Sequence, residues 1–225
     1  MNLEFEGGAV ASFTMTTFTT DSARPIKITG TPADAHSLAW AQFGEAYPLN
    51  EYRVSADAGG YALMQRLCDK DHSWGFTGLA ALIADVLVQG LTEHPYSCPD
   101  MIGGGECKNF YQQTHLDEGI FIAWAATACL MPAMQFSATP WRILSEEDFS
   151  QIKALLAVRE YWKPVLMQAL EQCRRSGEPI VRPVCYHFPE AAAYTSADAY
   201  MVGNELIVAP IVSPHTHHRQ WSRLW

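Results

Sequence analysis

Residues 69–106 have the sequence DKDHSWGFTGLAALIADVLVQGLTEHPYSCPDMIGGGE, in which two acidic loops flank an apolar run. The first loop begins at Asp69, and the second contains Asp100 ahead of three glycines. The apolar run predicts a buried helix, and residues 94–98 predict a short strand. A strand, a helix and a strand joined by polar loops form the repeat of a parallel sheet. In a β/α barrel the loops after the strands share one rim, so we expect both acidic loops to lie there and to carry the chemistry.

Composition and charge limit the classes of protein to which the chain can belong. With 225 residues, 48% of them hydrophobic and 17% charged, the chain can bury a sizeable core. It is short for a complete β/α barrel, which needs about 250 residues. The net charge of -9 repels the phosphates of nucleic acids, so we expect no nucleic-acid partner.

No stretch has the character of a membrane span or of a signal peptide. A span needs roughly 18 apolar residues, and the start MNLEFEGG lacks a basic and then apolar build. We therefore expect no membrane segment in this chain. A secreted or anchored form would carry its targeting segment elsewhere.

The spacing of cysteines and histidines gives no support for a metal site or a cofactor. The six cysteines contain no Cys-x-x-Cys pair, which argues against a zinc or redox motif. Cys98 and Cys107 flank the second acidic loop and could pair in an oxidising compartment, or these two could be separate buried thiols. His215, His217 and His218 have no carboxylates or cysteines in register, so we interpret them as part of a solvated tail.

Further elements follow from patterning along the chain. Ser145 opens a capping box for a long helix that ends at Gly177, with Pro164 kinking or splitting it. The lack of an internal repeat or a low-complexity linker predicts one domain. We expect the other elements to be strands at residues 9–19, 51–54, 61–68, 179–187 and 205–212, and helices at residues 33–47, 79–91 and 117–131.

Several motifs occur in the order seen in a known family. They are Asp69 with Trp74, Gly78-Leu79, and residues 99–104 (PDMIGG), 121–124 (FIAW), 131–137 (MPAMQFS), 177–183 (GEPIVRP) and 203–210 (GNELIVAP). Together they resemble glycoside hydrolase family 31, the retaining α-glycosidases, across nearly all of residues 10–212. The resemblance implies an α/β fold. Specifically, it implies a partial (β/α)8 TIM barrel at residues 1–212, missing its first strands and the flanking β-domains, and an irregular tail at residues 213–225.

The resemblance also implies a pair of catalytic carboxyl groups. Retaining cleavage needs a nucleophile and an acid/base about 5–5.5 Å apart. The family's nucleophile at a strand end falls on Asp21, within Phe18-Thr19-Thr20-Asp21. Thr19 stands where the family has Lys, and Ser22-Ala23-Arg24 replaces the usual Gly-Glu. The other interpretation of Asp21 is a turn or helix cap.

By the same resemblance the acid/base is Asp69, five residues before Trp74, with Asp71 as the competitor. Each could instead be an exposed loop carboxylate. Trp74 and the apolar helix would partly desolvate the carboxyl group and favour its protonated form, which a general acid needs. Lys70 would favour the anion.

The candidates for substrate binding are Arg53, Trp74, Asp100 and Gln135. Arg53 lies sixteen residues before Asp69, where the family has a sugar-binding Arg, and its alternative is a surface ion pair. Asp100 is the strongest single match, and the resemblance implies that it supports the floor of the active site. Its alternative is a place in a glycine-rich turn. A phosphate cradle is not expected, because no Lys-Ser or Lys-Thr follows the glycines.

Three tryptophans could form apolar walls for a sugar ring: Trp74, Trp124 and Trp141. Such residues are more often core, and we expect Trp124, on a buried helix, to be so. The family's Arg-Trp pair is Ala123-Trp124 here, so one polar contact is missing. Gln135 could bind substrate nearby.

These expectations combine into a retaining α-glycosidase that hydrolyses terminal α-linked glucosyl or galactosyl residues by double displacement. Its partner would be a carbohydrate substrate, with no cofactor, and its compartment the secretory-pathway lumen or the extracellular space if it is like the family. The alternative is a catalytically impaired member that binds carbohydrate or protein, which the changes around Asp21 favour. A third hypothesis is an unrelated metal-dependent hydrolase.

Overall fold

The structure is a computed structural model that describes residues 64–105, 116–189 and 198–214, together with Glu51 and the backbone of the strands between residues 2 and 52. Its content is mixed α/β. The strands are β1 (Asn2–Glu4), β2 (Val10–Ser12), β3 (Lys27–Thr29), β4 (Glu51–Tyr52), β5 (Met64–Arg66), β6 (Ser97–Cys98), β7 (Val181–Arg182), β8 (Tyr200–Val202) and β9 (Leu206–Val208). The helices are α2 (Leu82–Leu91), α4 (Glu118–Ala128), α5 (Pro140–Ile143) and α6 (Glu146–Ser176), with 3-10 turns η1 (Leu79–Ala81) and η2 (Val184–Tyr186).

The two acidic loops leave neighbouring parallel strands. β5 lies between β4 and β6 and pairs parallel with both. The loop that carries Asp69 follows β5, and the loop that carries Asp100 follows β6. Because parallel strands end at the same edge of their sheet, both loops leave that edge. The βα repeat predicted for this stretch is confirmed by β5, α2 and β6.

α2 forms where the apolar run predicted a helix, with η1 as its first turn. Leu82, Ile83 and Val86 are almost fully buried. Val88 and Leu91 on the same helix are 57% and 55% exposed. The helix is therefore covered along one stripe by the neighbouring elements and not all round.

Side-chain caps begin both α4 and α6, and the cap of α6 was predicted from the sequence. Asp117 Oδ1 accepts from the amide of Ile120 at 3.2 Å. Ser145 Oγ accepts from the amide of Asp148, also at 3.2 Å. At the other end of α6, Gly177 has a left-handed φ of 77°, which glycine adopts without a steric penalty. α6 runs through Pro164 as one helix, so of the two expectations for this proline, splitting is wrong.

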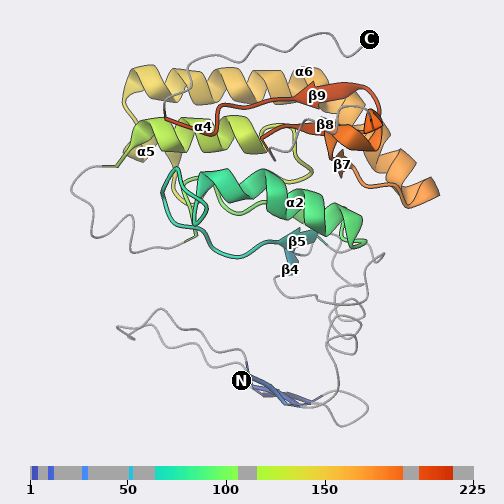
Figure 1. The fold of residues 1–225 in the computed structure, drawn as a ribbon. Helices are drawn as coiled ribbons and strands as arrows, with labels where there is room; N and C mark the ends of the chain where they lie inside the picture. The colour runs from blue at the N-terminus through green and yellow to red at the C-terminus, as the bar shows by residue number, and fades with distance from the viewer. Residues whose placement is uncertain are drawn as a thin grey trace.

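The helices enclose two apolar clusters that meet at α6. Figure 1 shows α4 lying between α2 and α6. One cluster centres on α4, where Phe121 and Trp124 are fully buried against Ile102 and η1. The other lies among α2, the C-terminal half of α6, β7 and β8. The packing of these clusters stabilises the helices and strands from which the two acidic loops extend. In the described part of the chain, no helix is long and apolar enough to cross a membrane.

Two predicted strands differ from the sequence expectation. Residues 179–187 contain only the short strand β7, because Pro183 has no amide hydrogen to continue a ladder and a 3-10 turn follows. β7 pairs antiparallel with β8, which was not predicted, and β8 pairs with β9. β2 is the part of the predicted strand 9–19 that the structure describes, and it pairs antiparallel with β1 and β3. It does not join the parallel sheet of β4, β5 and β6.

Candidate active site

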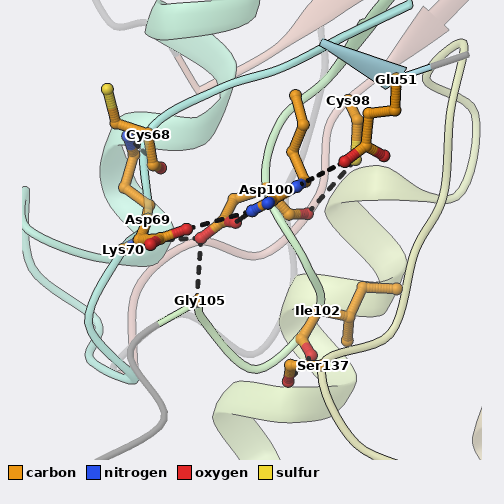
Figure 2. Close-up of polar contacts among 10 residues, drawn as sticks. Glu51, Cys68, Asp69, Lys70, Cys98, Asp100, Ile102, Gly105 and Ser137 are labelled. Atoms are coloured by element: carbon orange, nitrogen blue, oxygen red, sulfur yellow. Dashed lines mark hydrogen bonds and ion pairs between the residues drawn. The ribbon is translucent and has the colours of Figure 1, made fainter. Parts of the chain in front are cut away.

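A single guanidinium links a residue of β4 with the loops that follow β5 and β6. Arg66, the last residue of β5, donates from Nε to Glu51 Oε1 at 2.7 Å and from Nη1 to Asp69 Oδ1 at 3.0 Å. The same Nη1 lies 3.5 Å from Asp100 Oδ1. Figure 2 shows the carboxylates of Glu51, Asp69 and Asp100 gathered in one place. Asp69 and Asp100 are thus brought together, as the sequence predicted.

Asp100 is the buried anchor of this group. Its side chain is fully buried, and Oδ2 accepts from the amides of Lys70 at 2.8 Å and Gly105 at 3.1 Å. Burial raises the pKa of Asp100, while its bonds to backbone amides and the charge of Arg66 oppose that rise. The carboxylate therefore fastens the loop after β5 to the loop after β6.

The glycine loop packs closely against the loop that carries Asp69. A Cβ on Gly104 would approach the backbone oxygen of Lys70 at 2.5 Å, and a Cβ on Gly105 would overlap the carboxylate of Asp69. Gly104 also has a backbone φ of 94°, which residues other than glycine rarely adopt. The glycines are needed for this close approach between the two loops.

His72 ties the same two loops to the start of α4, a role that sequence analysis missed. Its ring is buried, with Nδ1 at 3.0 Å from Gly103 O and Nε2 at 3.0 Å from Asp117 O. Each carbonyl oxygen can accept only from a ring nitrogen that carries hydrogen, so the tautomer decides which of the two contacts His72 donates. An Asp-Lys-Asp-His run beside a glycine loop offers no pattern from which this bridge could be predicted.

The tryptophans separate into different environments. Trp74 donates from Nε1 to Asp117 Oδ2 at 3.2 Å and packs against the cluster around α4. Its polar edge therefore holds the first acidic loop to the N-terminus of α4. Trp124 is fully buried core, as expected, and Trp141 is 68% exposed.

Gln135 lies beside the second acidic loop. Its backbone oxygen accepts from the amide of Ile102 at 2.7 Å, and Ile102 forms a parallel bridge with Phe136. The side-chain oxygen Oε1 of Gln135 is buried and has no hydrogen-bond partner among the residues that the structure describes. Its predicted role in substrate binding stays a prediction.

The cation beside Asp69 is Arg66 and not the adjacent Lys70. The ammonium of Lys70 pairs with Asp85 on α2, with Nζ at 2.6 Å from Oδ2. The lysine is 8% exposed and lies on the side of the loop that faces this helix. Of the two cations, Arg66 is therefore the one that pairs with Asp69, and its three-residue spacing from Asp69 was the available signal.

The remaining predicted residues lie outside the described part of the chain. These are Asp21, Arg53, Cys107, His215, His217 and His218. Within the described part, no group of three or more His, Cys, Asp or Glu side chains could hold a metal ion.

The described cysteines are free thiols, so Cys98 forms no disulfide. Cys98 is fully buried, and that burial raises its pKa to about 11. Cys129 and Cys173 are buried too, while Cys68 and Cys185 are exposed.

Comparison with known proteins identifies the family. A family model described as the glycosyl hydrolase family 31 C-terminal domain matches residues 177–222. The myogenesis-regulating glycosidase of Mus musculus is 30% identical over 184 residues, which are 77% of this chain. The chain belongs to glycoside hydrolase family 31. Another family 31 relative is the α-glucosidase of Saccharolobus solfataricus, 27% identical over 195 residues and 75% of this chain.

Solved family 31 structures share the fold. A sulfoquinovosidase of this family from E. rectale superposes with a TM-score of 0.65 at 22% sequence identity and covers 82% of this chain. The chain spans about a quarter of its relatives: 25% of the mouse glycosidase, 27% of the S. solfataricus enzyme and 29% of the E. rectale chain.

Proposed function

We propose that the chain is part of a retaining α-glycosidase that hydrolyses terminal α-linked glucosyl or galactosyl residues. The observation that carries this proposal is the position of Asp69. It follows β5, lies beside the anchored carboxylate of Asp100 and accepts from Arg66. The names of the mouse and S. solfataricus relatives, a glycosidase and an α-glucosidase, support the same class of reaction.

In the proposed reaction two carboxyl groups act in turn. Asp21 attacks the anomeric carbon, while Asp69 protonates the leaving oxygen. Asp69 then removes a proton from the water that releases the glycosyl-enzyme. We assign the acid/base role to Asp69 over Asp71, because Asp69 is the one tied to Arg66. Arg53 and Gln135 are proposed to bind the sugar.

Asp100 and Trp74 have supporting places in this proposal. Both hold the first acidic loop by hydrogen bonds, Asp100 through the amide of Lys70 and Trp74 through Asp117. A loop fixed at both ends keeps the acid in one orientation, which general acid catalysis requires. Their contribution is therefore to position Asp69 beside the sugar.

The proposed architecture is a partial (β/α)8 TIM barrel over residues 1–212, followed by a tail at residues 213–225. The parallel order of β4, β5 and β6, with α2 as the crossover from β5 to β6, supports this assignment. The match of residues 177–222 to the family's C-terminal domain supports a passage out of the barrel near β7. The proposed compartment is the secretory-pathway lumen or the extracellular space.

Hydrolysis of 4-nitrophenyl α-glucoside and α-galactoside by the full-length protein tests the proposal. We expect Asp21→Asn to lower kcat/KM by at least about 100-fold, because it removes the nucleophile. Asp69→Asn should lower kcat by at least about 100-fold, because it removes the base that activates the water, whereas its kcat/KM should fall less, since 4-nitrophenolate leaves with little help from an acid. Proton NMR of the first product should show the α-anomer, since double displacement retains configuration. Equal background release by the wild type and both variants would instead support the impaired, binding-only member.

A further inference from the structure

Arg66 is held on two sides before it reaches Asp69. Glu51 fixes Nε from β4, at 2.7 Å. Asp100, itself fixed by two backbone amides, lies on the other side of Nη1. The side chain of Arg66 is only 13% exposed, so few other orientations are open to it. The direction of Nη1 towards Asp69 Oδ1 is therefore set by two elements that do not belong to the acid's own loop.

We propose that Arg66 is the positioning residue of the acid/base step: it holds Oδ1 of Asp69 and stabilises the carboxylate that forms as Asp69 gives up its proton. The inference rests on the proposed function. Arg66 belongs neither to the motifs that resemble the family nor to the site residues predicted from the sequence.

The charges around Arg66 suit this task. The groups that face it are Glu51 from β4, Asp69 from its own loop and Asp100 from the loop after β6. Burial lowers the pKa of Arg66, but its bonds and charge pairing with Glu51 and Asp69 outweigh that effect and raise it. The guanidinium therefore stays charged throughout a reaction cycle. The nearby ammonium of Lys70 is directed to Asp85, so Arg66 acts on Asp69 without that competitor.

The chemistry of the step makes the Arg66 bond stronger as the reaction proceeds. Oδ1 of Asp69 accepts from Nη1, and in the proposed step the proton leaves from the other oxygen, Oδ2. The Oδ2–H bond breaks as the glycosidic oxygen takes the proton. The bond from that oxygen to the anomeric carbon breaks, and the nucleophile's oxygen bonds to the same carbon. Asp69 changes from neutral to anionic, and its hydrogen bond to Arg66 becomes an ion pair, which favours the transition state over the ground state.

This gain depends on how much the leaving group needs a proton. An alkyl glycoside leaves as an alkoxide unless it is protonated, whereas fluoride leaves with little help. A residue that only maintains the fold would affect both substrates equally. A residue that acts through the acid affects the alkyl glycoside selectively.

The test measures kcat/KM of the full-length protein for the methyl α-glycoside and the α-glycosyl fluoride of whichever sugar the wild type accepts. We expect Arg66→Met to lower kcat/KM for the methyl glycoside on the order of 10- to 100-fold, the range for loss of one hydrogen bond to a charged group. For the fluoride the loss should be less than about threefold. Arg66→Lys, which keeps a cation but not the fork, should recover part of the loss.

Arg159→Met is the matched control for a structural effect. Arg159 lies on α6, far from Asp69 in sequence. Its truncation also removes three hydrogen bonds, which it donates to the backbone oxygens of Cys129, Met131 and Pro132. It should change both substrates by the same factor. If Arg66→Met is not folded, Glu51→Ala, which removes only the partner of Nε, carries the same comparison. Equal losses for the two substrates in the Arg66 or Glu51 variants would overturn this role, while no turnover of either substrate by the wild type would overturn the proposed function itself.

Discussion

Asp100 has a buried carboxyl group that three donors contact. The amides of Lys70 and Gly105 and the guanidinium of Arg66 all point to its carboxylate. Its backbone φ is 136°, a conformation that residues other than glycine rarely adopt. A strained and buried residue persists only where its surroundings fix it, and here the surroundings are the two loops that it joins.

Truncation of Asp100 should release these loops from each other. In Asp100→Ala the amides of Lys70 and Gly105 lose their acceptor inside the protein, which costs about 1–3 kcal/mol for each buried donor. Hydrogen–deuterium exchange of the full-length protein should show both amides exchanging at least about 10-fold faster. Asp100→Asn keeps one oxygen for the two amides, so its exchange should stay closer to that of the wild type. Unchanged exchange at both amides in Asp100→Ala would show that the loops are held by other contacts.

At the scale of elements, α6 has a side-chain cap at its N-terminus and ion pairs near its C-terminus. Ser145 caps its first turn, and Glu171 binds Arg174 at 2.9 Å and Arg175 at 2.7 Å near the last turn. The two arginines suit the negative end of the helix dipole. The negative charge of Glu171 alone would interact unfavourably with the negative end of the dipole. The two positive charges of Arg174 and Arg175 make the net charge near this end of the helix positive.

The ion pairs of Glu171 should make the last turn of α6 sensitive to acid. Its bonds to Arg174 and Arg175 lower the pKa of Glu171 from 4.5 to about 2. Because the folded-state pKa lies below the unfolded value, the stabilisation is fully present above pH 4.5 and is lost as the pH falls towards 2. The carboxyl carbon shift of Glu171 should therefore titrate with a midpoint near 2.

The matched variant is Arg174→Gln with Arg175→Gln, in which the same carbon should titrate near the ordinary value of 4.5. A wild-type midpoint that already lies there would show that the pairs are too weakly populated in solution to act on the helix end. Exposed pairs of this kind are also screened by salt, so the difference between the proteins should shrink as ionic strength rises.

At the scale of the whole molecule, local signals predicted the helices, and long-range contacts decided the rest. The caps at Ser145 and Gly177 and the apolar run of α2 depend on neighbours in sequence, so they were readable from it. The proximity of the loops that carry Asp69 and Asp100 could be predicted from the βα repeat. The spacing of Arg66 from Asp69 was a local signal for their ion pair, but the ion pair of Arg66 with Glu51 could not be predicted, because it depends on the register that sets β4 beside β5. The antiparallel pairing of β7 with β8 was missed because strands of two or three residues carry little pattern.

The two apolar clusters behave as one core if α6 couples them. Leu155 packs against both clusters, while the adjacent Leu156 is 41% exposed. Leu155→Ala should therefore lower the free energy of opening of both α2 and α4, by about 2 kcal/mol for a partly buried leucine. Hydrogen exchange measured separately for peptides of α2 and α4 checks this, with Leu156→Ala as the control that should change neither by more than about 0.5 kcal/mol. Loss of protection in only one of the two helices would mean that the two apolar clusters open independently. The two clusters would then not form a single cooperative unit.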